Sequence, residues 1–130
     1  MSSVVRKAML GAWVLLGGTL ACTGVANAEN RGQLSYAEDV RPILQIRCME
    51  CHSGNGPGVT SSGLSLETYE GLMKGTRFGP IVVPGNAMVS NLNVLVEGRA
   101  GIRMPHDRKR LTSCETSILH DWVNQGARNN

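Results

Sequence analysis

The sequence predicts an all-α domain, because helix signals stand near both ends of the chain and no convincing series of strands lies between them. Near the C-terminus, residues 112–115 read TSCE, a capping box in which Thr112 and Glu115 satisfy each other's backbone donors. An apolar stripe at helical spacing follows, and Gly126 stands where a C-terminal cap belongs. The stripe consists of Ile118, Leu119, Trp122 and Val123.

Residues 1–28 have the parts of a secretory signal peptide: a basic start, an apolar stretch and a small-residue site that ends at Ala28. We expect cleavage there, which leaves residues 29–130 as a single domain in the periplasm. Two other outcomes stay open: the leader remains as an N-terminal membrane anchor facing the periplasm, or Cys22 is lipidated. No membrane span is predicted in the mature chain, because no second apolar stretch is long enough.

Composition narrows the functional classes. Arg6 and Lys7 belong to the leader and account for two of the 13 basic residues, which leaves 11 against 10 acidic residues. A nearly neutral domain without a long basic stripe argues against a nucleic-acid partner. The mature chain also has little aromatic bulk for its core, so a group other than protein could fill its middle. Its aromatic residues are Tyr36, Tyr69, Phe78 and Trp122.

The first element of the mature chain is a helix. Residues 35–38 read SYAE, a second capping box, and apolar residues follow at helical spacing. Pro42 would kink the interior of a helix, so the longer helical piece is expected to start near Arg41. This helix leads directly into residues 48–52.

The middle of the chain predicts short elements. Residues 53–63 are dense in Gly and Ser and are expected to form a loop. Residues 64–73 predict a short helix ended by Gly75, and residues 81–85 predict an extended stretch. Asn86 is a candidate cap for a further short helix that stops at Gly98.

Residues 48–52 read CMECH, two cysteines three positions apart with a histidine directly after the second. This is the C-x-x-C-H pattern of covalent haem c attachment. Each thiol of Cys48 and Cys51 can add to one haem vinyl group, because a spacing of three on a helical turn puts both sulfurs along one edge of the macrocycle. His52 can then bind the iron on the proximal side. The pattern predicts one covalently bound haem c per chain.

Three other interpretations of this motif are possible. A redox-active dithiol would need a strand and helix context, which the sequence does not predict. Structural zinc would need four ligands, and no second paired knuckle accompanies Cys114, His106 and His120. A plain disulfide between Cys48 and Cys51 would explain the cysteines but not the adjacent histidine.

The chain resembles the class I cytochrome c domains, and among them the short planctomycete-type cytochrome c domain. The resemblance covers about residues 34–127 and is carried by DVRPIL, CMECH, GLSLETYEGLMKG, VVPGNAMVS, RMPH and HDWVNQGA. It implies a fold in which N- and C-terminal helices cross beside the covalently bound haem, with short helices and loops between them. It also implies that Met104, ahead of a proline in RMPH, is the distal iron ligand.

Chemistry also favours Met104 as the distal ligand. It stands in a predicted loop before the stiff Pro105, far enough along the chain to reach round the ring. Met73 and Met88 occupy predicted short helices, where a methionine usually fills gaps in the core. His106 would give bis-histidine ligation if the loop slipped, although an exposed polar residue is the simpler interpretation.

Three further features have both a structural and a functional interpretation. Cys114 is expected to be half-buried at a helix start, with an intermolecular disulfide or a reactive thiol as the alternative. His120 lies off the apolar stripe and is expected at the surface. Basic residues crowd the segment around Met104 and would form either a positive rim for an acidic redox partner or a solvated loop that pairs with haem propionates. These residues are Arg99, Arg103, Arg108, Lys109 and Arg110.

Together these features predict a periplasmic mono-haem c-type cytochrome that carries single electrons between a redox protein donor and acceptor, either freely or as a subunit of an oxidoreductase. No catalytic residue is predicted. The alternative is a haem enzyme or small-ligand sensor with an open or labile distal iron site, where Arg103 and His106 could act on a bound ligand. A structural module whose haem serves mainly as a folding core is a third possibility.

Overall fold

A computed structural model describes residues 32–130, so the predicted signal peptide of residues 1–28 lies outside the described residues. Residues 32–130 contain α-helices, one π-helical segment and no strand. Their one β-bridge joins Thr76 and Gly79. The prediction of an all-α chain is confirmed for this range. No helix among the described residues is long and apolar enough to cross a bilayer.

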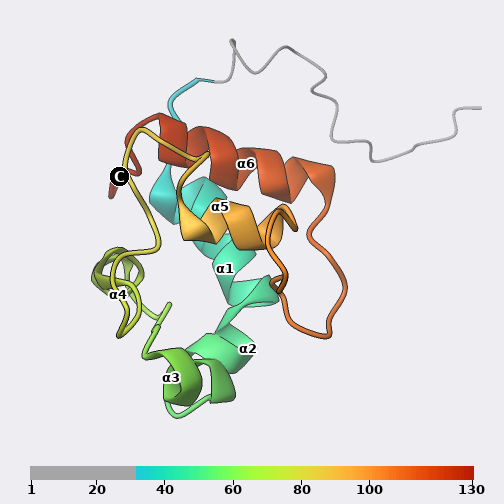
Figure 1. The fold of residues 1–130 in the computed structure, drawn as a ribbon. Helices are drawn as coiled ribbons and strands as arrows, with labels where there is room; N and C mark the ends of the chain where they lie inside the picture. The colour runs from blue at the N-terminus through green and yellow to red at the C-terminus, as the bar shows by residue number, and fades with distance from the viewer. Residues whose placement is uncertain (1–31) are drawn as a thin grey trace, which may run out of the picture.

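The helices are short except for the last one (Figure 1). In chain order they are the π-helix η2 (Tyr36–Val40), α1 (Arg41–Arg47), α2 (Met49–His52), α3 (Pro57–Ser62), α4 (Tyr69–Lys74), α5 (Asn91–Val96) and α6 (Ser113–Asn124).

The N-terminal helical pair begins after Ser35 and divides at Arg41, where the sequence predicts. Ser35 Oγ accepts from the backbone N–H of Glu38 at 3.2 Å, but the Ser35 N–H donates to the Asp39 carboxylate at 2.7 Å and not to Glu38. The cap is therefore reciprocal with a different acidic residue. Pro42 lies in the first turn of α1, where its missing N–H costs no helical hydrogen bond, which explains why α1 begins at Arg41.

Helix α6 has the boundaries that its signals predict. Both halves of the capping box are present: Thr112 Oγ1 accepts from the Glu115 N–H at 3.1 Å, and Glu115 Oε2 accepts from the Thr112 N–H at 2.7 Å. The helix ends before Gly126, whose φ of 101° lies in the region that glycine favours. Three of the four stripe residues are buried: Leu119, Trp122 and Val123.

The core forms where the two ends of the chain meet. Helix α6 packs against η2 and against α5, and Figure 1 shows α6 lying across both. Trp122 is the largest fully buried side chain, and it contacts Tyr36 and Tyr69 at ring-centroid distances of 5.8 and 6.5 Å. The fully buried Val40 and Leu44 continue this core along η2 and α1. Helices α2 and α3 lie at the other end of α1, away from α6 (Figure 1).

Three predictions for the middle of the chain need correction. Residues 53–63 were expected to be a loop, but they contain α3 (Pro57–Ser62), which is followed by Gly63 as its C-cap with φ 78°. The predicted helix over residues 64–73 begins only at Tyr69, because Thr68 caps it by accepting from the Gly71 N–H at 3.0 Å. Its predicted end at Gly75 is confirmed.

The third correction concerns α5, which begins at Asn91 and not at Asn86. The hydroxyl of the buried Ser90 accepts from the Val83 N–H at 2.8 Å and donates to the Asn86 carbonyl at 2.8 Å. These bonds fold residues 83–90 into turns that precede the helix. The predicted stop at Gly98, with φ 73°, agrees with the structure.

Candidate haem-attachment site

The C-x-x-C-H motif lies on one tight helical turn. Helix α1 ends at Arg47, and the carbonyl of Cys48 accepts from the backbone N–H groups of Cys51 at 3.2 Å and His52 at 3.1 Å. The two cysteines are therefore one turn apart. Both thiols are free and partly buried, so the alternative of a disulfide between them does not hold in this structure.

In the protein without haem, the thiol of Cys48 stays in its protonated form. Burial raises its pKa to about 11, and Glu115 and Cys51 push in the same direction, whereas Arg47 opposes them. The group is therefore a neutral thiol at pH 7. Cys48 packs against the hydrophobic core and therefore lies in an apolar environment.

The ring of His52 is oriented by a backbone carbonyl. Nδ1 lies 3.3 Å from the carbonyl oxygen of Leu64. Because a carbonyl can only accept, Nδ1 must carry the hydrogen, and Nε2 then has a lone pair for a metal. A hydrogen bond from the ring nitrogen that does not bind the metal is the usual way in which a metal-binding histidine is fixed in one tautomer. The His52 carbonyl also accepts from the Leu66 N–H at 2.8 Å, which holds the segment after α3 against the motif.

Two glycines beside the motif were missed by the sequence interpretation. A Cβ at Gly58 would lie 2.6 Å from His52 Cε1 and 2.7 Å from Nδ1, and one at Gly56 would lie 2.5 Å from the Cys51 carbonyl oxygen. Only glycine lets α3 pack this closely on the imidazole. The sequence signal was ambiguous, because glycines in a Gly- and Ser-rich stretch look like loop residues.

Met104 lies partly buried against the core cluster, and its N–H donates to the carbonyl of Leu95 in α5 at 3.1 Å. The peptide bond between it and Pro105 is cis. The competitor His106 is 64% exposed and pairs with Asp107 at 3.1 Å. Met73 is partly buried as expected, but Met88 is 61% exposed, so its predicted core position is wrong: it lies in the turns before α5 and not on a helix.

The remaining candidates lie in three kinds of environment. Cys114 is partly buried on the first turn of α6, as expected. His120 was expected at the surface, but its side chain is only 31% exposed, and its Nδ1 lies 2.9 Å from Glu97 Oε1. Arg103 is half-buried, whereas the side chains of residues 108–110 are exposed.

The residues present fit a covalently attached haem c. Two free thiols lie one turn apart, and the histidine that follows them keeps Nε2 available. Next to Met104, the buried Nε of Arg103 has no hydrogen-bond partner among the described residues, so a donor is available there for a carboxylate such as a haem propionate.

The two metal and redox alternatives fit the described residues less well. Residues 32–130 contain no strand that could form the strand and helix context of a thioredoxin-like dithiol. Within residues 32–130, no group of three or more His, Cys, Asp and Glu side chains is arranged to hold a metal ion such as structural zinc.

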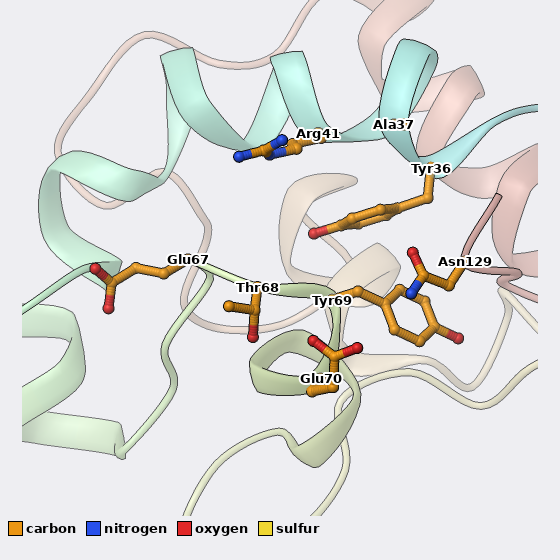
Figure 2. A pocket seen from close by; sticks show the side chains of 8 residues that line it. All are labelled: Tyr36, Ala37, Arg41, Glu67, Thr68, Tyr69, Glu70 and Asn129. Atoms are coloured by element: carbon orange, nitrogen blue, oxygen red, sulfur yellow. The ribbon is translucent and has the colours of Figure 1, made fainter.

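A separate cavity of about 290 Å³ opens between the N-terminal helices and the start of α4 (Figure 2). Tyr36 and Arg41 line one side, and Glu67 and Glu70 lie across from them. Burial raises the pKa of the Tyr36 hydroxyl, Glu70 adds to this, and Arg41 opposes it. None of the predicted haem ligands lines this cavity, so it is distinct from the attachment site.

Comparison with known families agrees with this chemistry. Residues 48–107 match the family model described as Planctomycete cytochrome C. No curated protein and no solved structure matches the chain. The matched stretch begins at Cys48, includes the attachment motif and α3 to α5, and ends three residues after Met104. A domain of this family implies covalent haem c and electron transfer. Over residues 48–107 the chain is therefore similar to a planctomycete-type cytochrome c domain.

Proposed function

We propose that this protein is a periplasmic mono-haem c-type cytochrome that carries single electrons between redox partners, as a soluble carrier or as the cytochrome subunit of an oxidoreductase. Cys48 and Cys51 hold the haem by thioethers, His52 is the proximal iron ligand and Met104 is the distal one. Haem c supplies an iron that takes up and releases one electron. With His52 and Met104 as ligands, that iron keeps no open position for a substrate. No residue is assigned a catalytic role.

The observation that supports this most is the orientation of His52. The Leu64 carbonyl at 3.3 Å fixes the hydrogen on Nδ1, and Gly58 lets α3 lie directly against the ring. An imidazole held in one tautomer and one rotation presents Nε2 in a constant direction. Such a ligand suits an iron that must change oxidation state without changing its surroundings.

The arrangement of helices supports a class I cytochrome c fold. The packing of α6 on η2 is what the expected crossing of N- and C-terminal helices requires. Met104 lies on the connection between α5 and α6, partly buried and anchored to Leu95. A methionine ligand raises the reduction potential relative to histidine, because its thioether favours ferrous iron.

The cellular setting of the proposal rests on the leader. Residues 1–28 act as a signal peptide, and residues 29–130 form one cytochrome c domain in the periplasm or, if the leader is retained, on a membrane anchor facing it. The exposed basic residues 108–110 suit an acidic face on the redox donor or acceptor. Weak redox encounters bury little surface, so a large apolar patch is not required.

The test is the visible spectrum of the protein from a host that matures c-type haem, measured oxidised and reduced, for wild type and for Met104→Ala. We expect wild type to be low-spin with the weak long-wavelength band of an iron–methionine bond. Met104→Ala should lose that band and bind CO. Met88→Ala is the matched control, because Met88 is 61% exposed and should leave both properties unchanged.

Three outcomes count against the proposal. A wild type that is already high-spin and binds CO would favour the enzyme or ligand-sensor alternative. A variant that keeps the methionine band would remove Met104 as the ligand. Export and maturation that yield no haem would reject the assignment of Cys48 and Cys51.

A further inference from the structure

Two contacts join the attachment motif to the segment that follows Met104. Arg47, directly before Cys48, donates from Nη2 to the carbonyl oxygens of Lys109 at 3.0 Å and Arg110 at 2.5 Å. Glu50, inside the motif, accepts from Arg108 Nη2 at 2.6 Å. Residues about 60 positions apart in the sequence are thereby tied together on both sides of Cys48.

The Arg47 contact is the stronger of the two. Its side chain is only 19% exposed, and its Nε also lies 3.6 Å from Glu115 Oε1, the carboxylate that caps α6. Arg47 therefore links the motif, the connection before α6 and α6 itself. The Glu50 and Arg108 side chains are 70% and 60% exposed, and an ion pair this exposed contributes little on its own.

The connection that carries Met104 is held at both of its ends. At its start, the Met104 N–H donates to Leu95 in α5. At its end, the carbonyls of residues 109 and 110 accept from Arg47. In Figure 1 this connection forms the long loop between α5 and α6, which returns beside α1 and α2. Only residues 105–108 lie between the two anchored ends.

We propose that Arg47 is a positioning residue for the distal ligand, and that the Glu50–Arg108 pair assists it. Together they latch residues 108–110 to the attachment motif, which keeps Met104 across the haem from His52. This inference rests on the proposed function, since it takes Met104 as the distal ligand. It adds that residues beside the proximal ligand determine whether the distal position of the iron stays closed. Breaking the latch leaves the haem attached and opens the distal position to external ligands.

The test compares haem-loaded wild type with Arg47→Gln and Arg108→Gln. The measurements are haem content, the methionine band and the dissociation constant for imidazole added to the oxidised protein. A charged hydrogen-bond donor of this kind is worth a factor of about ten to a hundred, so Arg47→Gln should bind imidazole more tightly by up to that factor. Arg108→Gln should tighten binding only about two- to fivefold.

The matched control is Arg110→Gln. Like Arg47→Gln it removes one positive charge, here from the segment that Arg47 contacts, but the Arg110 side chain is exposed and its carbonyl still accepts from Arg47. We expect its imidazole affinity to equal that of wild type. If Arg110→Gln tightens binding as much as Arg47→Gln does, the effect comes from charge and the latch is rejected.

The two hypotheses fail in different ways. A wild type without the methionine band overturns the proposed function, and the latch with it. A wild type with the band, beside a fully loaded Arg47→Gln of unchanged imidazole affinity, overturns the latch alone. If Arg47→Gln does not mature, Glu50→Gln and the double variant Glu50→Gln/Arg108→Gln decide. Each should match the modest tightening of Arg108→Gln because the two residues act as one pair, and unchanged affinity in all of them overturns the latch.

Discussion

The absence of a side chain at Gly58 allows α3 to lie close to His52, the candidate proximal ligand. At Gly58 even a methyl group would fall within 2.8 Å of three atoms of the motif: His52 Cε1, His52 Nδ1 and the Cys51 carbonyl oxygen. Real Cβ atoms almost never come this close to a neighbour, so either α3 or the imidazole must move. Either movement would change the contact between Nδ1 and the Leu64 carbonyl oxygen, which is 3.3 Å long.

Gly58→Ala is therefore expected to change the electronic environment of the iron and not merely stability. Alanine in a helix is favoured over glycine by about 1 kcal/mol, so a purely local effect would leave the protein equal or more stable. We expect instead a shifted low-spin electron paramagnetic resonance signal and a changed midpoint potential in haem-loaded protein. Ser61→Ala, on an exposed position of the same helix, is the control. A signal identical to wild type in Gly58→Ala would show that α3 does not set the ring.

The residues of the motif could be read from the sequence, whereas their supports could not. Cys48, Cys51 and His52 are adjacent in the chain, so their chemistry is visible as a pattern. Leu64 acts through its backbone carbonyl, which every residue has, and Gly58 acts by having no side chain. Contacts of this kind leave no residue-type signal and emerge only when the chain is folded.

At the scale of elements, long amphipathic stretches predict well and short polar helices do not. Helix α6 combines a capping box with an apolar stripe, and its boundaries were predicted from the sequence. Helix α3 has no buried residue, and its hydroxyls bond to its own backbone: Thr60 Oγ1 donates to the Pro57 carbonyl at 3.1 Å and Ser62 Oγ to the Gly58 carbonyl at 2.6 Å. Without an apolar stripe there was no periodicity to detect.

Glu97, at the end of α5, connects this helix to α6 and, through Arg99, to the turn before α5. It makes the packing of these segments depend on pH. Its Oε1 contacts His120 in α6 at 2.9 Å, and its Oε2 accepts from Arg99 at 2.6 Å. Arg99 also donates to the Met88 carbonyl at 2.9 Å, which ties down the turn before α5. Burial alone would raise the pKa of Glu97, but the hydrogen bonds and charges of His120 and Arg99 together outweigh it, and the pKa is lowered.

A lowered pKa in the folded state means that ionised Glu97 stabilises the fold. The contribution is fully present above the ordinary pKa of 4.5 and is lost as the pH falls through the lower folded value. We expect Glu97→Gln to lower the free energy of unfolding by about 1 kcal/mol at pH 7, and the difference from wild type to shrink below pH 4.5. Urea unfolding across this pH range measures it, with the exposed Glu38→Gln as control. A difference that is the same at all pH values would contradict the assignment.

At the scale of the whole molecule, the two ends of the described chain are fastened to each other. Asn130 lies at the N-terminus of η2, where its side-chain carbonyl accepts from the Tyr36 N–H at 3.1 Å and its side-chain amide donates to the Leu34 carbonyl at 3.2 Å. Its backbone oxygen accepts from Ser35 Oγ at 2.7 Å and from the Ala37 N–H at 3.1 Å. Asn130 thus caps a helix more than 90 residues away in the sequence.

The contacts of Asn130 lie next to the aromatic core, because Tyr36 takes part in both. Its backbone N–H donates to Asn130, and its ring belongs to the core. Tyr36 packs on Tyr69 at 5.1 Å and on Trp122 at 5.8 Å, and the Trp122 Nε1–H donates to the Arg128 carbonyl at 3.0 Å. The segment after α6 therefore covers the aromatic side chains and then caps η2. Such a contact between chain ends could not be predicted from local patterns, because neither end carries a signal that names the other.

Asn130→Ala should weaken this closure without touching the attachment motif. The substitution removes the two side-chain hydrogen bonds and leaves the two backbone ones, so we expect a loss of about 1–2 kcal/mol in the free energy of unfolding, as for other helix caps. Amide hydrogen exchange should accelerate at residues 36–40 more than in α2, since the loss is local to η2. Asn129→Ala is the matched control, because none of the bonds to residues 34–37 involves its side chain. Haem content and the methionine band should be unchanged in both variants. Equal stability of the two variants would mean that the backbone contacts of residue 130 alone hold the ends together.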